Sequence, residues 1–169
     1  MRTIKFKGTC ITPEREGEAV YGSLLALPDE KVRILEPCSG GVFNFCIVDP
    51  DTVCQFTGFL DKNGKEIYEG DVLRSDEYPY SCIGDKKRDN YYAVVYYCEE
   101  GACFGTVTAK NPSSDVRGIS DGILDDVERE KMKTFEVVGN IHEEKWQQYG
   151  EYFKTEEEKE ADNDLCRRP

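Results

Sequence analysis

His142 is the one histidine of the chain and the first candidate for catalysis. A Ser-His-Asp or Cys-His system would have to use its imidazole as the base. A general base also needs a partner and a cleft, whereas His142 lies where an expected strand gives way to an expected helix. A histidine at such a junction is more often structural or solvated, so we expect that the protein is not an enzyme.

Eight cysteines are many for a chain of 169 residues. Cys98 and Cys103 are the closest pair, and their sulfurs face each other if the four residues between them form a hairpin loop. Two cysteines supply half of a zinc site, and only the fold could bring Cys38, Cys46 or His142 to complete it. No C-x-x-C spacing occurs. We expect free thiols packed as small apolar side chains, with no metal and no cofactor.

Four aspartates, Asp49, Asp51, Asp61 and Asp71, could suggest a carboxylate cluster that binds a metal. Each of them adjoins proline or glycine or stands where a turn is expected, so Asx turns explain them better. The segment from Asp61 begins like a calcium loop, but its glycine comes at the fourth position instead of the sixth and the glutamate at the twelfth is missing. The chain also has no glycine-rich phosphate-binding motif, so nucleotide binding has no support.

Ten tyrosines are the most unusual feature of the composition, and four of them fall in the segment 91–98. Strand alternation places Tyr92 and Tyr96 on one face and Tyr91 and Tyr97 on the other. Core packing on both faces explains them, and so does a surface for a second copy or a partner, because tyrosine gives a large contact area at low entropic cost. Base stacking is a further alternative, but it lacks the basic groove. The candidate interface residues are Tyr92, Tyr96, Tyr97, Trp146, Tyr149 and Phe153.

The elements that must position these side chains are mostly short strands. Two turns, at Asn63-Gly64 and at Gly70, lie so close together that they imply a small, strongly curved meander, as in a compact barrel. The segments whose alternation or β-branched content predicts strands are 2–7, 18–26, 31–35, 42–48, 72–74, 91–98, 102–109 and 134–141.

The order of these elements predicts three parts. Residues 1–50 form an N-terminal β subdomain, and residues 51–142 form a barrel subdomain with an insertion at about 110–133. Within the insertion, a short helix is predicted over residues 121–131. Residues 143–169 follow as a C-terminal helix and an acidic tail. The apolar stripe of that helix is formed by Trp146, Tyr149 and Phe153.

The charge of the chain is strongly negative, with 34 acidic and 22 basic side chains and a net charge of −12. Proteins that bind nucleic acid through its phosphates usually have a basic surface, so direct binding is disfavoured. Anionic membrane surfaces are disfavoured for the same reason. The N-terminal residues do not resemble a signal peptide, and the longest apolar run has eight residues where a membrane helix needs about 20. We therefore expect a cytoplasmic protein with no membrane partner.

Five segments together resemble the YopX family of phage, prophage and mobile-element proteins. They are residues 2–8, 20–24, 51–58, 61–72 and 139–143, and the block DKNGKEIYEGDV at 61–72 is the most specific. The resemblance covers about residues 1–143. It implies a mainly β fold of curved antiparallel sheets with an SH3-like barrel module and self-association, in a bacterial host cell. The shared positions are mostly turn residues, here Asn63, Gly64, Gly70 and Gly139.

The first hypothesis for function is a self-associating interaction or scaffold module. The motives are the family resemblance, the tyrosine-rich strand and the missing catalytic constellation; its partners would be further copies and an unidentified host or phage protein. The alternative is a regulatory module that acts on nucleic acid, which suits an SH3-like barrel, or that acts on host DNA-binding machinery, which an acidic body could block by mimicking DNA. An enzyme, or a zinc protein through Cys98 and Cys103, is the third hypothesis.

Overall fold

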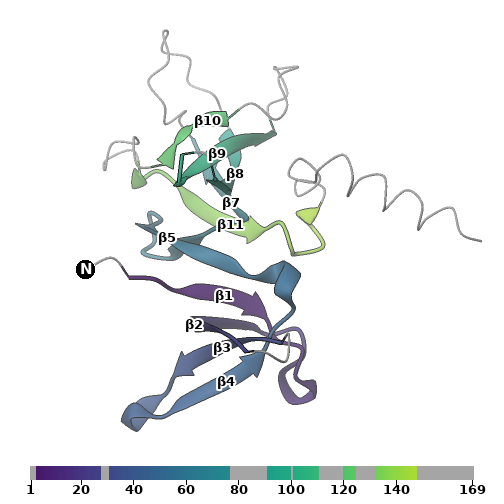
Figure 1. Ribbon diagram of the computed structural model, residues 1–169. Coiled ribbons are helices and arrows are strands. Elements are labelled where there is room, and N and C mark those ends of the chain that lie inside the picture. Colours follow the sequence, from purple (N-terminus) through teal and green to yellow (C-terminus); the bar gives the residue numbers. More distant parts are fainter. Residues whose placement is uncertain are drawn as a thin grey trace, which may run out of the picture.

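The computed structural model of the protein is built almost entirely from antiparallel strands that form two sheets (Figure 1). The predicted mainly β fold of antiparallel sheets is therefore confirmed. The residues that the structure describes are 3–27, 31–76, 91–99, 101–110, 120–124 and 132–147.

The first sheet has six strands in the order β4-β3-β2-β1-β5-β6 and occupies the lower part of Figure 1. An isolated antiparallel bridge between Cys10 and Val48 brings the chain after β1 beside the end of β4. The core of this sheet contains Cys10, Val20, Ile34, Cys46 and Val48. The strands are β1 (Phe6–Thr9), β2 (Ala19–Ala26), β3 (Val32–Pro37), β4 (Phe43–Ile47), β5 (Cys54–Leu60) and β6 (Glu66–Tyr68). Three short 3-10 turns join them: η1 (Pro13–Arg15), η2 (Ser39–Gly41) and η3 (Pro50–Thr52).

The second sheet has five strands in the order β10-β9-β8-β7-β11. Its central strand is the tyrosine-rich segment, in which Tyr91 and residues 93–95 are buried while Tyr92 and Tyr96 are half-buried and Tyr97 is 40% exposed. Tyr91, Ala93 and Val95 face one core with Phe135, while Val94 faces a second cluster. The strands are β7 (Asp71–Ser75), β8 (Tyr91–Cys98), β9 (Cys103–Lys110), β10 (Ser120–Ile123) and β11 (Glu136–Asn140).

Three expectations about architecture need revision. The described strands do not close into an SH3-like barrel, because β5 and β6 pair with the first sheet and leave β10 and β11 as open edges of the second. The helix predicted over residues 121–131 is wrong at its start, since residues 120–123 form β10 and pair with β9. Most of the predicted C-terminal helix, including Tyr149 and Phe153, lies outside the described residues.

The division between the sheets falls at the turn between β6 and β7, not near residue 50. The reason is that β5 pairs with β1, with Phe6 opposite Gln55 and Lys7 opposite Cys54. Within the described part of the chain, no helix is long and apolar enough to cross a membrane.

Candidate functional site

The turn Glu69–Gly70 joins the two sheets and lies within the segment that carries the most specific family motif. The N–H of Gly70 donates to the carbonyl of Val95 at 2.8 Å, and its carbonyl accepts from the N–H of Ile141 at 2.9 Å. The φ angle of Gly70 is +72°, which favours glycine. A side chain there would also approach Asn140 and Ile141 at 3.1 Å. Gly70 therefore lets the connecting turn lie against β8 and the end of β11.

Asp71 is the polar centre of this junction and is only 2% exposed. Its Oδ2 accepts from the N–H of Tyr68 at 2.7 Å, and its Oδ1 accepts from Nδ2 of Asn140 at 3.0 Å. Its carboxylate also forms an ion pair with Lys7, whose ammonium lies over the ring of Tyr68. Asn140 donates in addition to the carbonyl of Glu69 at 3.2 Å. One buried carboxylate thus ties β1, β6 and β11 together.

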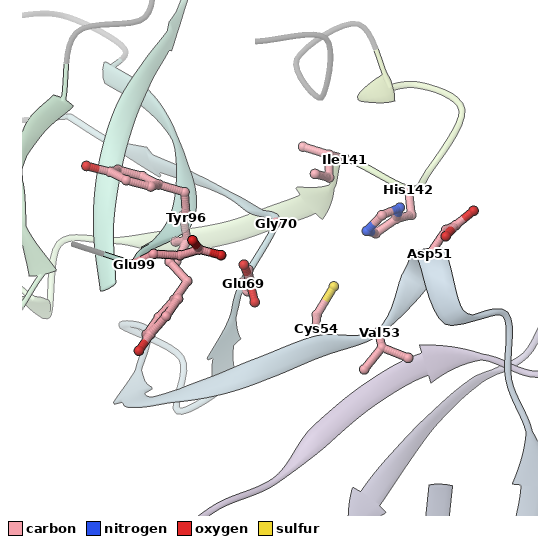
Figure 2. A pocket seen from close by; sticks show the side chains of 11 residues that line it. Asp51, Val53, Cys54, Glu69, Gly70, Tyr96, Glu99, Ile141 and His142 are labelled. Carbon is pink, nitrogen blue, oxygen red and sulfur yellow. The ribbon is translucent and has the colours of Figure 1, made fainter. Parts of the chain in front are cut away.

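A pocket of about 370 Å³ opens beside this junction, between the two sheets. Figure 2 shows the thiol of Cys54 and the carboxylate of Glu69 on one side and the imidazole of His142 near Asp51 on the other. Cys54 comes from β5, Glu69 from the turn before β7, and His142 from the segment after β11. The polar and aromatic residues that line it are Asp51, Cys54, Glu69, Tyr96, Tyr97, Glu99 and His142.

Burial shifts the pKa values of three groups in this pocket, Cys54, Glu69 and His142. It raises the pKa of the Cys54 thiol to about 12, so this sulfur stays protonated at neutral pH. It also raises the pKa of Glu69 against the opposing effect of hydrogen bonds to the backbone of Gln55 and Tyr97. For His142, burial and then the charge of Lys7 lower the pKa. The arrangement therefore offers hydrogen-bonding groups, and Cys54 lacks the thiolate character that a nucleophile uses.

The hairpin between β5 and β6 is organised by Asp61, which is 6% exposed. Its Oδ1 accepts from the N–H groups of Asn63 and Lys65, each at 2.8 Å, and its Oδ2 accepts from the N–H of Val137 in β11 at 3.1 Å. Gly64 has a φ of +78°, whereas Asn63 does not have a positive φ. The aspartate therefore caps a turn and also holds β11, and the turn is not one in which both central residues are left-handed.

Gly139 is not a turn residue, which corrects the expectation from the sequence. It lies within β11, at the point where the pairing of β11 with β7 shifts register. A Cβ atom there would overlap Nε1 and Cδ1 of Trp146. The glycine is needed because the indole ring takes the space that a side chain would fill.

The candidate interface residues occupy different environments. Trp146 is 8% exposed and packs with Val72 and Val94 of its own second sheet. Tyr92 is half-buried, with its ring centroid 6.2 Å from that of Trp146. Tyr96 is half-buried beside the pocket, and Tyr97 is 40% exposed. Tyr149 and Phe153 are outside the described residues.

The alternative of a zinc site at Cys98 and Cys103 finds only these two cysteines together among the described residues. Cys98 and Cys103 are opposite each other in the β8–β9 ladder. Cys38 follows β3 and Cys46 lies in the core of the first sheet. Among the described residues, no group of three or more His, Cys, Asp or Glu side chains is placed to hold a metal ion. The six described cysteines are free thiols.

A second surface, the outer face of β2, β3 and β4, was missed by the reasoning from sequence. Phe43 and Phe45 of β4 are 61% and 68% exposed, and Leu25 of β2 is 37% exposed. Phe45 is opposite Leu35 of β3, so these side chains share one face of the sheet. We call Leu25, Leu35, Phe43 and Phe45 the outer apolar patch. The available signal was that segment 42–48 is apolar at both alternate sets of positions, so both of its faces need cover.

Comparison with known proteins supplies the family. The family described as YopX protein matches residues 14–145, which is most of the chain. A comparison with curated proteins finds no match. The matched range contains both sheets from β2 onward, the turn Glu69–Gly70, the Asp71 network and the pocket. The chain belongs to the YopX family.

Proposed function

We propose that this protein is a self-associating interaction and scaffold module, and not an enzyme, and that it assembles through the first sheet. The observation that carries the proposal is the outer apolar patch. Its two phenylalanines, Phe43 and Phe45, are more than half exposed on neighbouring positions of one strand face. Contiguous apolar surface of this kind, as distinct from scattered single residues, is typical of interaction sites.

The energetic reason is that solvent contact of the patch is unfavourable. Burial of apolar surface contributes about 25 cal/mol per Å², and aromatic side chains dominate the energetics of many interfaces. The four residues of the patch are uncharged, on a chain with a net charge of −12, and the charged side chain beside them on the same face is that of Arg33, which is opposite Leu25. Two copies can therefore approach through it with less repulsion than through most of their remaining surface.

The alternative function, a regulatory module that mimics DNA, cannot use three carboxylates that form ion pairs within the fold. A mimic needs free acidic side chains on the surface, at a spacing like that of phosphates. Asp71 is buried in an ion pair with Lys7, Glu66 pairs with Lys5 at 2.6 Å, and Glu36 pairs with Arg15 at 2.5 Å. These three carboxylates are therefore not free for mimicry. We favour self-association because the outer apolar patch supports it directly.

Native mass spectrometry of the reduced full-length protein, with light scattering after size exclusion across the micromolar range, tests the proposal. We expect a discrete oligomer without bound metal. A monomer at every concentration would overturn self-association, and one tightly bound zinc ion per chain would move attention to the cysteines. Binding of the protein to a purified DNA-binding protein, displaced by duplex DNA, would support the alternative instead.

A further inference from the structure

Over Phe43–Phe45, before Ile11 covers its end at Ile47, the edge strand β4 lacks the features that keep sheet edges from pairing. The four edge strands of the two described sheets are β4, β6, β10 and β11. The pairings of β6, β10 and β11 with their neighbours each contain a register shift, whereas the β3–β4 ladder is regular over five residue pairs. β4 also has no proline and no charged residue. Such irregularities and charges normally prevent edge-to-edge association.

No hydrogen-bond partner among the described residues meets the outward backbone groups of Phe43 and Phe45 in β4. In an antiparallel ladder, hydrogen-bonded and non-hydrogen-bonded residue pairs alternate. The carbonyl of Val42 accepts from the N–H of Cys38 at 2.8 Å, so the backbone N–H and C=O groups of the even-numbered residues in β4 point toward β3. The backbone groups of the odd-numbered residues therefore point toward the open edge. Ile47 fits this pattern, because its carbonyl accepts from the N–H of Ile11, which lies outside β3, at 2.9 Å.

The open edge is accessible from its inner side as well. A hollow of about 260 Å³ runs along β4, between Phe43–Cys46 and the turn η1. Asn44 and Arg15 both line it, and Arg15 is engaged with Glu36. Asn44 is exposed, so its side chain is beside open space in the part of the chain that the structure describes.

We propose that β4 pairs antiparallel with β4 of a second copy, about a two-fold axis at Asn44. This inference rests on the proposed self-association and names its contact. Phe43 of one copy lies opposite Phe45 of the other, and the two pairs exchange four backbone hydrogen bonds. Ile47 is not used, because Ile11 already occupies it. The axis preserves the faces of the sheet, so the outer apolar patches of both copies join in one continuous surface.

The apolar contact of such a dimer is small. A phenylalanine buries about 150–250 Å² when it is fully covered, so 61% and 68% exposure leaves roughly 100–150 Å² on each ring. The rings stand on the outer face of the joined sheet, so the pairing covers only the side of each ring that meets the ring opposite. Four backbone hydrogen bonds and these ring contacts stay below the roughly 1,000 Å² of a stable interface, so we expect a weak dimer that forms with rising concentration.

The first experiment compares the mass of the wild-type protein with that of Phe45→Lys by light scattering and native mass spectrometry. Phe45 is 68% exposed, so the substitution leaves the core intact, and circular dichroism checks the fold. We expect wild-type dimers or larger even-numbered assemblies and a Phe45→Lys variant that dissociates at least tenfold more readily. Leu60→Lys is the matched control, because Leu60 is 51% exposed on β5, at the other side of the same sheet.

The second experiment tests the register with Asn44→Cys. Residues opposite each other in a non-hydrogen-bonded pair have Cα atoms about 4.5 Å apart, which is within the range of a disulfide. Under mild oxidation we expect a covalent dimer whose linked peptides both contain position 44. Wild type gives the background from its own cysteines.

Each result decides between the two proposals. A wild-type oligomer that Phe45→Lys leaves unchanged, or a 44–44 disulfide that does not form, overturns the β4 pairing while self-association stands. A wild-type monomer at all concentrations overturns both. A monomer that instead binds an added apolar extended peptide, and loses it in Phe45→Lys, shows that the edge takes a strand from a different protein, and the second-copy proposal is then wrong.

Discussion

Among single residues, Gly139 and Trp146 determine how the chain leaves the second sheet. The indole ring packs on Val72 and Val94 and fills the space above Gly139, while Lys145 lies over its other side at 4.7 Å from the ring centroid. A glycine in a strand usually weakens it, and here its lack of a side chain permits a close approach. Because Gly139 has no side chain, the indole ring of Trp146 can pack against it and anchor the end of β11.

Gly139→Ala is expected to lower the free energy of unfolding by about 1–3 kcal/mol, the usual cost of overpacking. The new methyl group would displace the ring of Trp146, which is the one tryptophan of the chain. Urea unfolding gives the stability, and the tryptophan emission should shift to longer wavelength. In a Trp146→Ala background the same substitution should cost much less, and equal costs in both backgrounds would contradict the contact.

Glu69 is expected to oppose folding at neutral pH. Burial raises its pKa above the ordinary 4.5, so the folded state holds the proton more tightly than the unfolded state. Protonated Glu69 favours the folded state. This contribution to stability is fully present below the pKa of Glu69 in the unfolded chain and is lost as the pH rises through its pKa in the folded protein. Glu69→Gln should therefore raise Tm at neutral pH, and its advantage should shrink in acid.

Thermal unfolding followed by circular dichroism over a series of pH values checks this prediction. Glu99→Gln is the control, because Glu99 lines the same pocket but is exposed. A lower Tm for Glu69→Gln at neutral pH would show that the carboxylate does more for the fold through its backbone hydrogen bonds than burial costs.

Among the elements, the β5–β6 hairpin shows how local preference and tertiary contact combine. Asp61 caps its own turn through Asn63 and Lys65 and then reaches β11 through the N–H of Val137. The turn is predictable from Asp61 to Lys65, since aspartate, asparagine and glycine favour such conformations within a few residues. The bond to Val137 is not, because 76 positions separate the two residues.

Gly64→Ala is expected to destabilise the protein by about 1–2 kcal/mol, since a left-handed backbone is strained for an L-residue with a Cβ atom. The φ of Gly64 is +78°, and open space surrounds the position, so packing does not contribute. Gly64→Asn should retain most of the stability, because asparagine tolerates this region. Chemical denaturation of both variants distinguishes the backbone effect from any other, and equal losses would argue against it.

Over the whole molecule, the two sheets are joined by buried polar contacts as well as by the chain. Asp71 links Lys7 of the first sheet with Asn140 of the second, and Gly70 bonds to Val95 and Ile141. This junction forms one wall of the pocket, so its rigidity sets the pocket's shape. The outer apolar patch lies on the opposite edge of the first sheet, four strands from β5 in the order of the sheet.

Asp71→Asn is expected to lower the free energy of unfolding by about 3–5 kcal/mol, because it leaves the charge of Lys7 without its buried partner. Asp76→Asn is the matched control: Asp76 pairs with Arg74 but is 80% exposed, so its loss should cost at most about 1 kcal/mol. Calorimetry measures both. A small effect at Asp71 would mean that solvent reaches Lys7 after the substitution.

Local sequence patterns are enough to predict the mainly β composition, most of the strand positions, the tight turns near Asn63 and Gly70, and the family. These features depend on alternation and backbone preference, which act over a few neighbouring residues. The three-dimensional fold was needed to find that β5 pairs with β1 and that the described sheets do not close. It was also needed to find that Gly139 leaves space for the ring of Trp146 and that Phe43 and Phe45 are exposed to solvent. The physical reason is that these outcomes depend on contacts across long stretches of chain, such as the 64 positions between Lys7 and Asp71, which a local pattern does not encode.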